Sequence, residues 1–210
     1  MTAQTDSAET PFHEVVDAVA ATAGLPRLRD TPLPPGVRRE VRAYIGFGPV
    51  YPQDVVRLWE DRAGTHGWRG RWWPGVQVPY PMAERTASDS AAAQRRQAAW
   101  VDGIRKFASG RGCTDLRSRD DYEVCTLPTA RVDWGATLAR LDSLGVGRLA
   151  RPGNRGGEDG VSLVVEYRDA GGYRAYSYWS PSAAAVNADE RAASEIMELL
   201  SGLGGQTGRH

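Results

Sequence analysis

Two short segments of the chain alternate arginine with large aromatic residues, and they are the best candidates for a binding site. In the first segment, Arg69, Arg71 and Trp73 share one face of a predicted strand. Trp68 and Trp72 lie on the other face. Arginine stacked on flat rings forms a surface for sugars, nucleobases or anionic ligands. The alternative interpretation is that one face is core and the other carries ordinary cross-strand pairs.

The second segment places Arg174, Tyr176 and Tyr178 on one face of another predicted strand. If both segments faced the same side of one sheet, they would form a single aromatic and arginine surface. The predicted binding residues are therefore Arg69, Arg71, Trp73, Arg174, Tyr176 and Tyr178. This prediction depends on strand register, because a slip of one residue moves Arg174 to the opposite face.

Carboxylates are the residues that a rival, catalytic interpretation would use. Two convergent acids with unequal pKa values carry out glycoside hydrolysis, and Glu60, Asp61 and Glu166 are the candidates. Adjacent strand residues point to opposite faces, so Glu60 and Asp61 converge only if a loop places them together. The alternative interpretation is that these acids are solvated residues near turns.

Other catalytic and metal-binding motifs are missing from the sequence. His13 and Glu14 begin a segment similar to the zincin helix, but Asp17 stands where the second histidine is required. The chain has no nucleophile elbow, no P-loop and no complete dinucleotide-binding glycine motif. His66 lies in a predicted turn and His210 is the last residue, which disfavours a histidine-activated nucleophile. We therefore predict no metal and no cofactor.

Cys113 and Cys125 are the two cysteines, and a polar turn signal, Ser118 to Asp121, lies between them. Folded as a hairpin, this segment brings the two thiols within reach of a disulfide. In a reducing cytosol the same pair would remain as free thiols, and both states stay open. Two cysteines without further ligands at suitable spacing do not form a zinc site.

The elements that must position these residues alternate between strand and helix patterns. Alternating apolar residues predict strands near 41–47, 55–61, 68–73, 161–168 and 173–179, the last two forming a hairpin. Apolar residues at helical spacing predict helices near 11–23, 90–108, 133–144 and 187–203. Tight turns between strands favour antiparallel pairing. We therefore predict an α+β fold, with a curved antiparallel sheet and about four helices packed mainly on one face.

A proline-rich connector, residues 25–36, follows the first helix and is expected to be extended and irregular. The first helix is therefore predicted to be a loosely attached arm, and deletion of residues 1–30 is predicted to leave a folded domain. The predicted organisation is an N-terminal helix with its connector (1–36), a single α+β domain (37–204) and a flexible tail (205–210).

The predicted C-terminal hairpin also carries a resemblance. Asp159 to Arg168, followed after the turn by Tyr173 to Pro181, resembles a stretch found in assorted uncharacterised bacterial proteins. The resemblance implies a bacterial α+β domain and no particular activity.

The N-terminus lacks the basic and apolar segments of a secretory signal, which indicates a cytoplasmic protein, or an exported one whose signal was removed.

Composition excludes two classes of function. The 26 basic and 26 acidic residues cancel, so no nucleic acid is expected as a partner. No apolar run approaches the length of about 18 residues that a membrane span needs. The leading prediction is a non-catalytic domain that binds a small molecule or a protein partner through the aromatic and arginine face of the sheet, which the helices are expected to leave uncovered. A carboxylate-using hydrolase is the rival prediction, and a structural or assembly role is the third.

Overall fold

The computed structural model describes residues 11–46, 53–74, 90–109, 112–119, 122–150 and 160–203. The strands in this part of the chain are β1 (Arg39–Gly46), β2 (Gln53–Asp61), β3 (Gly64–Pro74), β4 (Asp115–Arg119), β5 (Tyr122–Thr126), β6 (Ser162–Asp169) and β7 (Gly172–Trp179). The helices are α1 (Pro11–Thr22), α2 (Ser90–Ser109), α3 (Trp134–Ser143) and α4 (Ala188–Gly202). The predicted tail, residues 205–210, lies outside the described residues.

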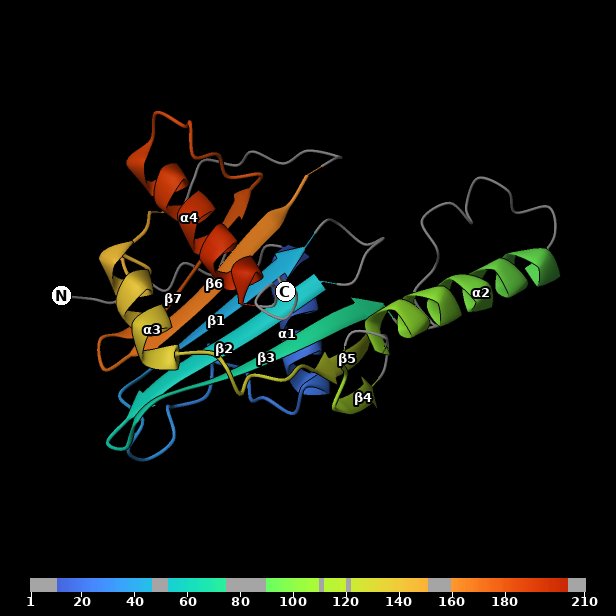
Figure 1. Ribbon diagram of the computed structural model, residues 1–210, viewed down its shortest axis with the longest axis horizontal. Helices are drawn as coiled ribbons and strands as arrows, with labels where there is room; N and C mark the ends of the chain where they lie inside the picture. The colour runs from blue at the N-terminus through green and yellow to red at the C-terminus, as the bar shows by residue number, and fades with distance from the viewer. Residues whose placement is uncertain are drawn as a thin grey trace.

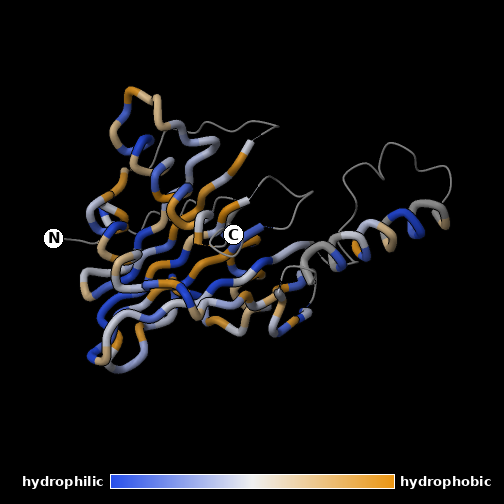
Figure 2. The backbone as a smooth tube through the Cα atoms, in the orientation of Figure 1, coloured by the Kyte–Doolittle hydropathy of each residue, from blue (hydrophilic) through white to orange (hydrophobic). Residues whose placement is uncertain are grey.

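The strands form one open sheet in the order β4-β5-β3-β2-β1-β6-β7, and every neighbouring pair is antiparallel. This architecture confirms the predicted α+β class. The strand predicted near residues 55–61, whose pattern also fitted a short helix, is β2. Apolar segments gather along the central strands, as Figure 2 shows. These strands are buried on both faces because helices cover both.

The first face of the sheet is covered by α3 and α4, which lie in front of it in Figure 1. Val41 and Ala43 of β1 share a buried cluster with Leu138 and Leu141 of α3 and with Ile196 of α4. Each of these five side chains is at most 2% exposed. We call this side of the sheet the α3–α4 face.

The second face is covered by α1, which lies behind the sheet in Figure 1. Val16 and Val19 are 4% and 0% exposed, and they share a buried cluster with Tyr44, Val55 and Trp72 of three central strands. Burying a valine contributes about 1.5 to 3 kcal/mol, so α1 is part of the core. The expectation of a loosely attached arm is therefore wrong. The helices are divided between the two faces rather than packed mainly on one.

Arginines of the sheet hold α1 and the connector in place. They donate to main-chain carbonyls of this segment: Arg42 to Pro26, Arg117 to Ala23, and Arg168 to Leu28 and Arg29. The connector forms no strand or helix, so its carbonyl groups need donors from elsewhere. Guanidinium groups from β1 and β6 supply them, while Arg117 of β4 binds Ala23 just after α1.

The cysteine hairpin is confirmed. Cys113 and Cys125 are joined by a disulfide, with their Cα atoms 5.6 Å apart, which is a separation typical of real bridges. Cys125 is fully buried and packs with Trp73 and Leu127. The bridge therefore joins the start of the edge hairpin to β5, where Cys125 packs into the interior.

The helix predicted at residues 90–108 is α2, which extends away from the sheet in Figure 1. Near its C-terminal half, Val101 is 2% exposed and Trp100 packs against the cluster around Trp73. No helix in the described residues is both long and apolar enough to cross a membrane.

Candidate functional site

Strand register brings all six predicted binding residues to one face of the sheet. Arg69 pairs with Val56 and Tyr176 pairs with Val165, and both valines belong to the core of the α3–α4 face. Because side chains alternate along a strand, the residues at two-residue steps from Arg69 and Tyr176 share this face. However, β2, β1 and β6 separate β3 from β7, a distance of roughly 19 Å. The predicted surface is therefore divided into two distant halves.

The half on β7 anchors the segment that follows α3. Tyr176 and Tyr178 are 5% and 3% exposed. Their hydroxyls donate to the carbonyls of Val146 (3.0 Å) and Ala150 (2.7 Å). Burial raises the pKa of Tyr178 to about 12, so its hydroxyl remains a donor. Arg174 is exposed and donates to another carbonyl of the same segment.

The half on β3 is a charged cluster. Nη2 of Arg69 lies 2.8 Å from Oδ2 of Asp54, and Nε of Arg71 lies 3.1 Å from its Oδ1. The side chain of Arg69 is 5% exposed, and its Nε has no hydrogen-bond partner in the part of the chain that the structure describes. Trp73 is buried and donates to Glu123. Trp73 therefore belongs to the core, while Arg69 and Arg71 share the carboxylate of Asp54.

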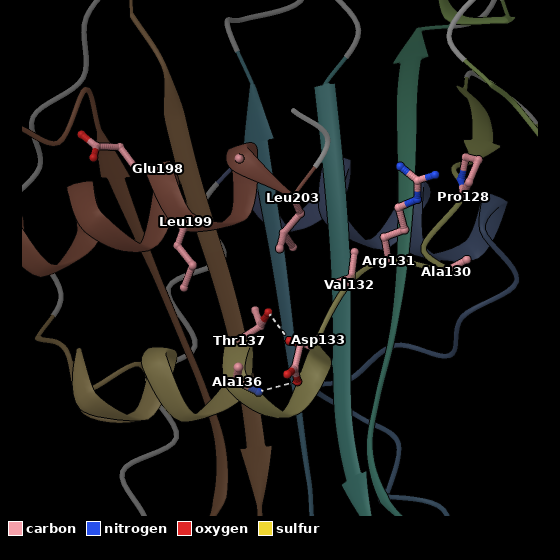
Figure 3. A pocket seen from close by; sticks show the side chains of 11 residues that line it. Pro128, Ala130, Arg131, Val132, Asp133, Ala136, Thr137, Glu198, Leu199 and Leu203 are labelled. Carbon is pink, nitrogen blue, oxygen red and sulfur yellow. Dashed lines mark hydrogen bonds between the residues drawn. The ribbon is translucent and has the colours of Figure 1, made fainter. Parts of the chain in front are cut away.

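A groove of about 880 Å³ opens on the α3–α4 face, between α3, the end of α4 and residues 128–133 (Figure 3). Its lining is largely apolar and includes Val132, Ala136, Leu199 and Leu203. This volume and this lining are typical of small-molecule sites. The sequence did not predict the groove, because three separate segments of the chain form it.

Hydrogen bonds at the start of α3 fix one side of the groove. The carboxylate of Asp133 accepts a bond from the Ala136 amide (2.9 Å), and the Thr137 hydroxyl donates to the Asp133 carbonyl (2.7 Å), as Figure 3 shows. Trp134 sits directly over Gly67 of β3, where any Cβ would collide with its ring. These contacts fix the position of α3 on the sheet.

Arg131 is the cationic residue of the groove lining. Its side chain is exposed, and it makes no hydrogen bond or ion pair among the described residues. In Figure 3 it extends over β3, while Glu198 lies at the far end of the groove and points away from it. Arg131 therefore presents a guanidinium with unused donors beside an apolar surface.

The carboxylates of the rival hydrolase prediction do not converge. Glu60 lies 2.7 Å from Nε of Arg39, and it shares the α3–α4 face with Leu58 two residues earlier. Asp61 accepts a bond from the backbone amide of Ala63 (2.7 Å) in the β2–β3 turn. Glu166 lies two residues from Val164, whose side chain contacts α1 on the opposite face.

Among the described residues, neither His66 nor a group of metal-ligating side chains forms a second site. His66 was expected in a turn, but it lies in β3, where its Nε2 is 3.1 Å from Oδ1 of Asp61 and its ring stacks on Trp59. Within the described ranges, no three His, Cys, Asp or Glu side chains are grouped to hold a metal ion.

Glu166 belongs to a buried polar cluster under α1. It is 3% exposed, and its two carboxylate oxygens accept bonds from the hydroxyls of Tyr44 (3.1 Å) and Tyr173 (2.9 Å). Burial raises the pKa of Glu166 above its ordinary 4.5, although the Arg42 charge and the two tyrosine bonds oppose this rise. Both carboxylate oxygens of Glu166 are bound by side chains of the protein interior, so the role of this cluster is structural.

A pH dependence of stability follows from this raised pKa. The folded state binds more protons than the unfolded state at pH values from 4.5 up to the folded pKa, so stability falls as pH rises through that window. The stability advantage of wild type over Glu166→Gln should therefore shrink across this window. Urea unfolding of both proteins at several pH values measures the difference. A difference that grows with pH would show that the folded pKa is lowered instead.

No family model, curated protein or solved structure matches this chain. The fold and the site define an α+β protein with one open antiparallel sheet, two covered faces and a groove on the α3–α4 face. The resemblance of the C-terminal hairpin to bacterial proteins stays a prediction.

Proposed function

We propose that this protein is a non-catalytic binding domain, and that it holds an elongated apolar small molecule in the groove between α3 and α4. The observation that carries the proposal is the groove itself, which is concave, largely apolar and about 880 Å³ in volume. The sequence predicted a site on a sheet face that the helices leave uncovered, but α3 and α4 cover the face that carries the six predicted residues. The proposed site is built from helix and loop residues in place of the two arginine and aromatic strands.

A small molecule is favoured over a protein partner because exposed apolar residues are scattered. Leu116 and Val186 are the exposed large hydrophobic residues in the described part of the chain. Leu116 lies on β4, and Val186 lies in the loop before α4. Isolated residues of this kind occur on ordinary protein surfaces, whereas a protein interface presents a contiguous patch. The apolar surface of the groove is contiguous and concave instead.

A bulky side chain placed in the groove is expected to block ligand binding. The neutral fluorophore N-phenyl-1-naphthylamine is expected to bind wild type with enhanced fluorescence. Ala136 is exposed and lines the groove, so Ala136→Trp should weaken this binding at least tenfold by filling the space. Stability should change by only about 0.5 kcal/mol, because the position is on the surface.

The matched control is Ala139→Trp. Ala139 is also exposed on α3, but it lies outside the groove lining, so this variant should bind the fluorophore as wild type does. The proposal is wrong if wild type gives no saturable fluorescence increase. It is also wrong if Ala136→Trp binds as tightly as Ala139→Trp.

A further inference from the structure

We infer that the ligand of the groove is an amphipathic carboxylate, whose head group binds Arg131 and whose apolar chain lies along the groove. This inference rests on the proposed function, because it names the chemical class of molecule that the same groove takes. It is carried by the position of an unpaired guanidinium at the edge of an apolar surface.

Arg131 differs from the paired arginines of the α3–α4 face. Arg69 and Arg71 are bound to Asp54, and Arg140 of α3 is paired with Glu195 of α4. The donors of Arg131, by contrast, have no partner in the described structure. A guanidinium presents several N–H groups in a planar fork, which binds a carboxylate through two parallel hydrogen bonds.

The acidic residues of the groove do not occupy this fork. The carboxylate of Asp133 is committed to the Ala136 amide at the start of α3. Glu198 is at the opposite end of the groove and points away from Arg131 in Figure 3. An anionic head group at Arg131 therefore meets an unused donor set, whereas a cationic head group would meet repulsion.

The sheet beneath carries two further arginines. The backbone amide of Leu127 donates to the carbonyl of Arg69, which places the segment leading to Arg131 beside β3. Arg69 and Arg71 share the carboxylate of Asp54. The buried carboxylate of Glu123 lies on the same face, two residues from Cys125, which pairs with Arg71. The two acids balance the two arginines, so the attraction for an anion at this end of the groove comes from Arg131.

The apolar part of the ligand is set by the groove walls. Val132, Leu199 and Leu203 line the space next to Arg131, and Leu199 and Leu203 also pack against the core of the sheet. Apolar groups on two sides of a concave space exclude water from a chain lying between them. A medium-length alkyl chain with one terminal carboxylate combines both requirements.

Three ligands with the same chain and different head groups test this inference. Decanoate, 1-decanol and decyltrimethylammonium are titrated, below micelle formation at pH 7.5, to displace N-phenyl-1-naphthylamine from wild type. Decanoate should compete about tenfold more strongly than decanol, and the cation should compete least. Arg131→Gln should remove the preference for decanoate while leaving competition by decanol unchanged. Arg148→Gln is the matched control, because Arg148 is exposed and lies outside the groove lining.

The outcomes distinguish failure of the carboxylate inference from failure of the proposed function. Equal competition by decanoate and decanol would leave the groove as a binding site and overturn the carboxylate inference. A decanoate preference that survives Arg131→Gln would also overturn it, because Arg131 would not be the head-group ligand. Failure of the fluorophore to bind wild type would overturn the proposed function, and the inference would fall with it.

Discussion

Deletion of residues 1–30 is expected to abolish cooperative unfolding of the protein. The deletion removes the buried side chains of Val16, Val19 and Ala20 and exposes their partners on the sheet, including Trp72. Each buried valine contributes about 1.5 to 3 kcal/mol, and the whole stability of a domain is only about 5 to 15 kcal/mol. The deletion also leaves the buried guanidinium of Arg42 without its bond to the connector.

Urea unfolding followed by circular dichroism measures this effect. The matched control is Glu14→Ala, which changes an exposed residue of α1 and should alter stability by about 0.5 kcal/mol or less. A truncated protein that still unfolds in one sharp transition, near the wild-type midpoint, would show that residues 37–204 fold alone, as the sequence suggested.

Replacement of Arg42 by alanine is expected to destabilise the protein by about 3 to 5 kcal/mol. The side chain of Arg42 is fully buried. Its Nε lies 2.7 Å from Glu40 and its Nη1 lies 2.6 Å from the carbonyl of Pro26. Its positive charge also favours the ionised form of Glu166. Alanine would leave the buried carboxylate of Glu40 with a single arginine, Arg57, and would remove from Glu166 the positive charge that favours its ionised form.

The control for this prediction is Arg38→Ala. The side chain of Arg38 is 65% exposed, and its Nη1 lies 3.7 Å from Glu60; exposed pairs of this kind contribute about 0 to 1 kcal/mol. Equilibrium urea unfolding of both variants gives the comparison. If Arg42→Ala does not fold, Arg42→Met keeps most of the packing and is still expected to lose more stability than Arg38→Ala. Equal losses in Arg42→Met and Arg38→Ala would contradict the prediction.

Local sequence patterns were sufficient to predict the elements and the proximity of the two cysteines. The period of two along β6 and β7 predicted their hairpin, and Asp169 pairs with Gly172 across a two-residue loop. The turn signal between the cysteines predicted their proximity, which the 5.6 Å separation of their Cα atoms confirms. These features depend on neighbours in the sequence, so local chemistry determines them.

Long-range packing could not be predicted in the same way. The prolines of the connector correctly indicated irregular chain, but its carbonyls are bound by Arg168, which lies 140 residues from Leu28 along the sequence. The order of the strands in the sheet likewise cannot be predicted from the two-residue alternation along any one strand. Arg71 and Arg174 therefore face the same side, as required, yet lie on strands separated by three others.

The groove left one weak signal in the sequence. In the segment predicted as the last helix, helical spacing puts Ile196, Leu200 and Leu203 on one face, and Leu199 lies beside that face. An apolar residue next to a buried face indicates a second apolar contact. The structure places Leu199 in the groove lining. The sequence does not specify its partner Val132, because the approach of residues 128–133 to α4 is a tertiary contact.

The docking of α1 also has a consequence for protein synthesis. The helix leaves the ribosome before β6, but its binding surface includes Val164 of that strand, and its connector is held by Arg168 of the same strand. At about 5 to 20 residues per second, the intervening 140 residues take roughly 7 to 28 s to synthesise. Throughout that interval the apolar face of α1 has no completed sheet to cover it. The apolar face of α1 is therefore a site where the nascent chain is exposed to aggregation, or bound by chaperones, until β6 has been made.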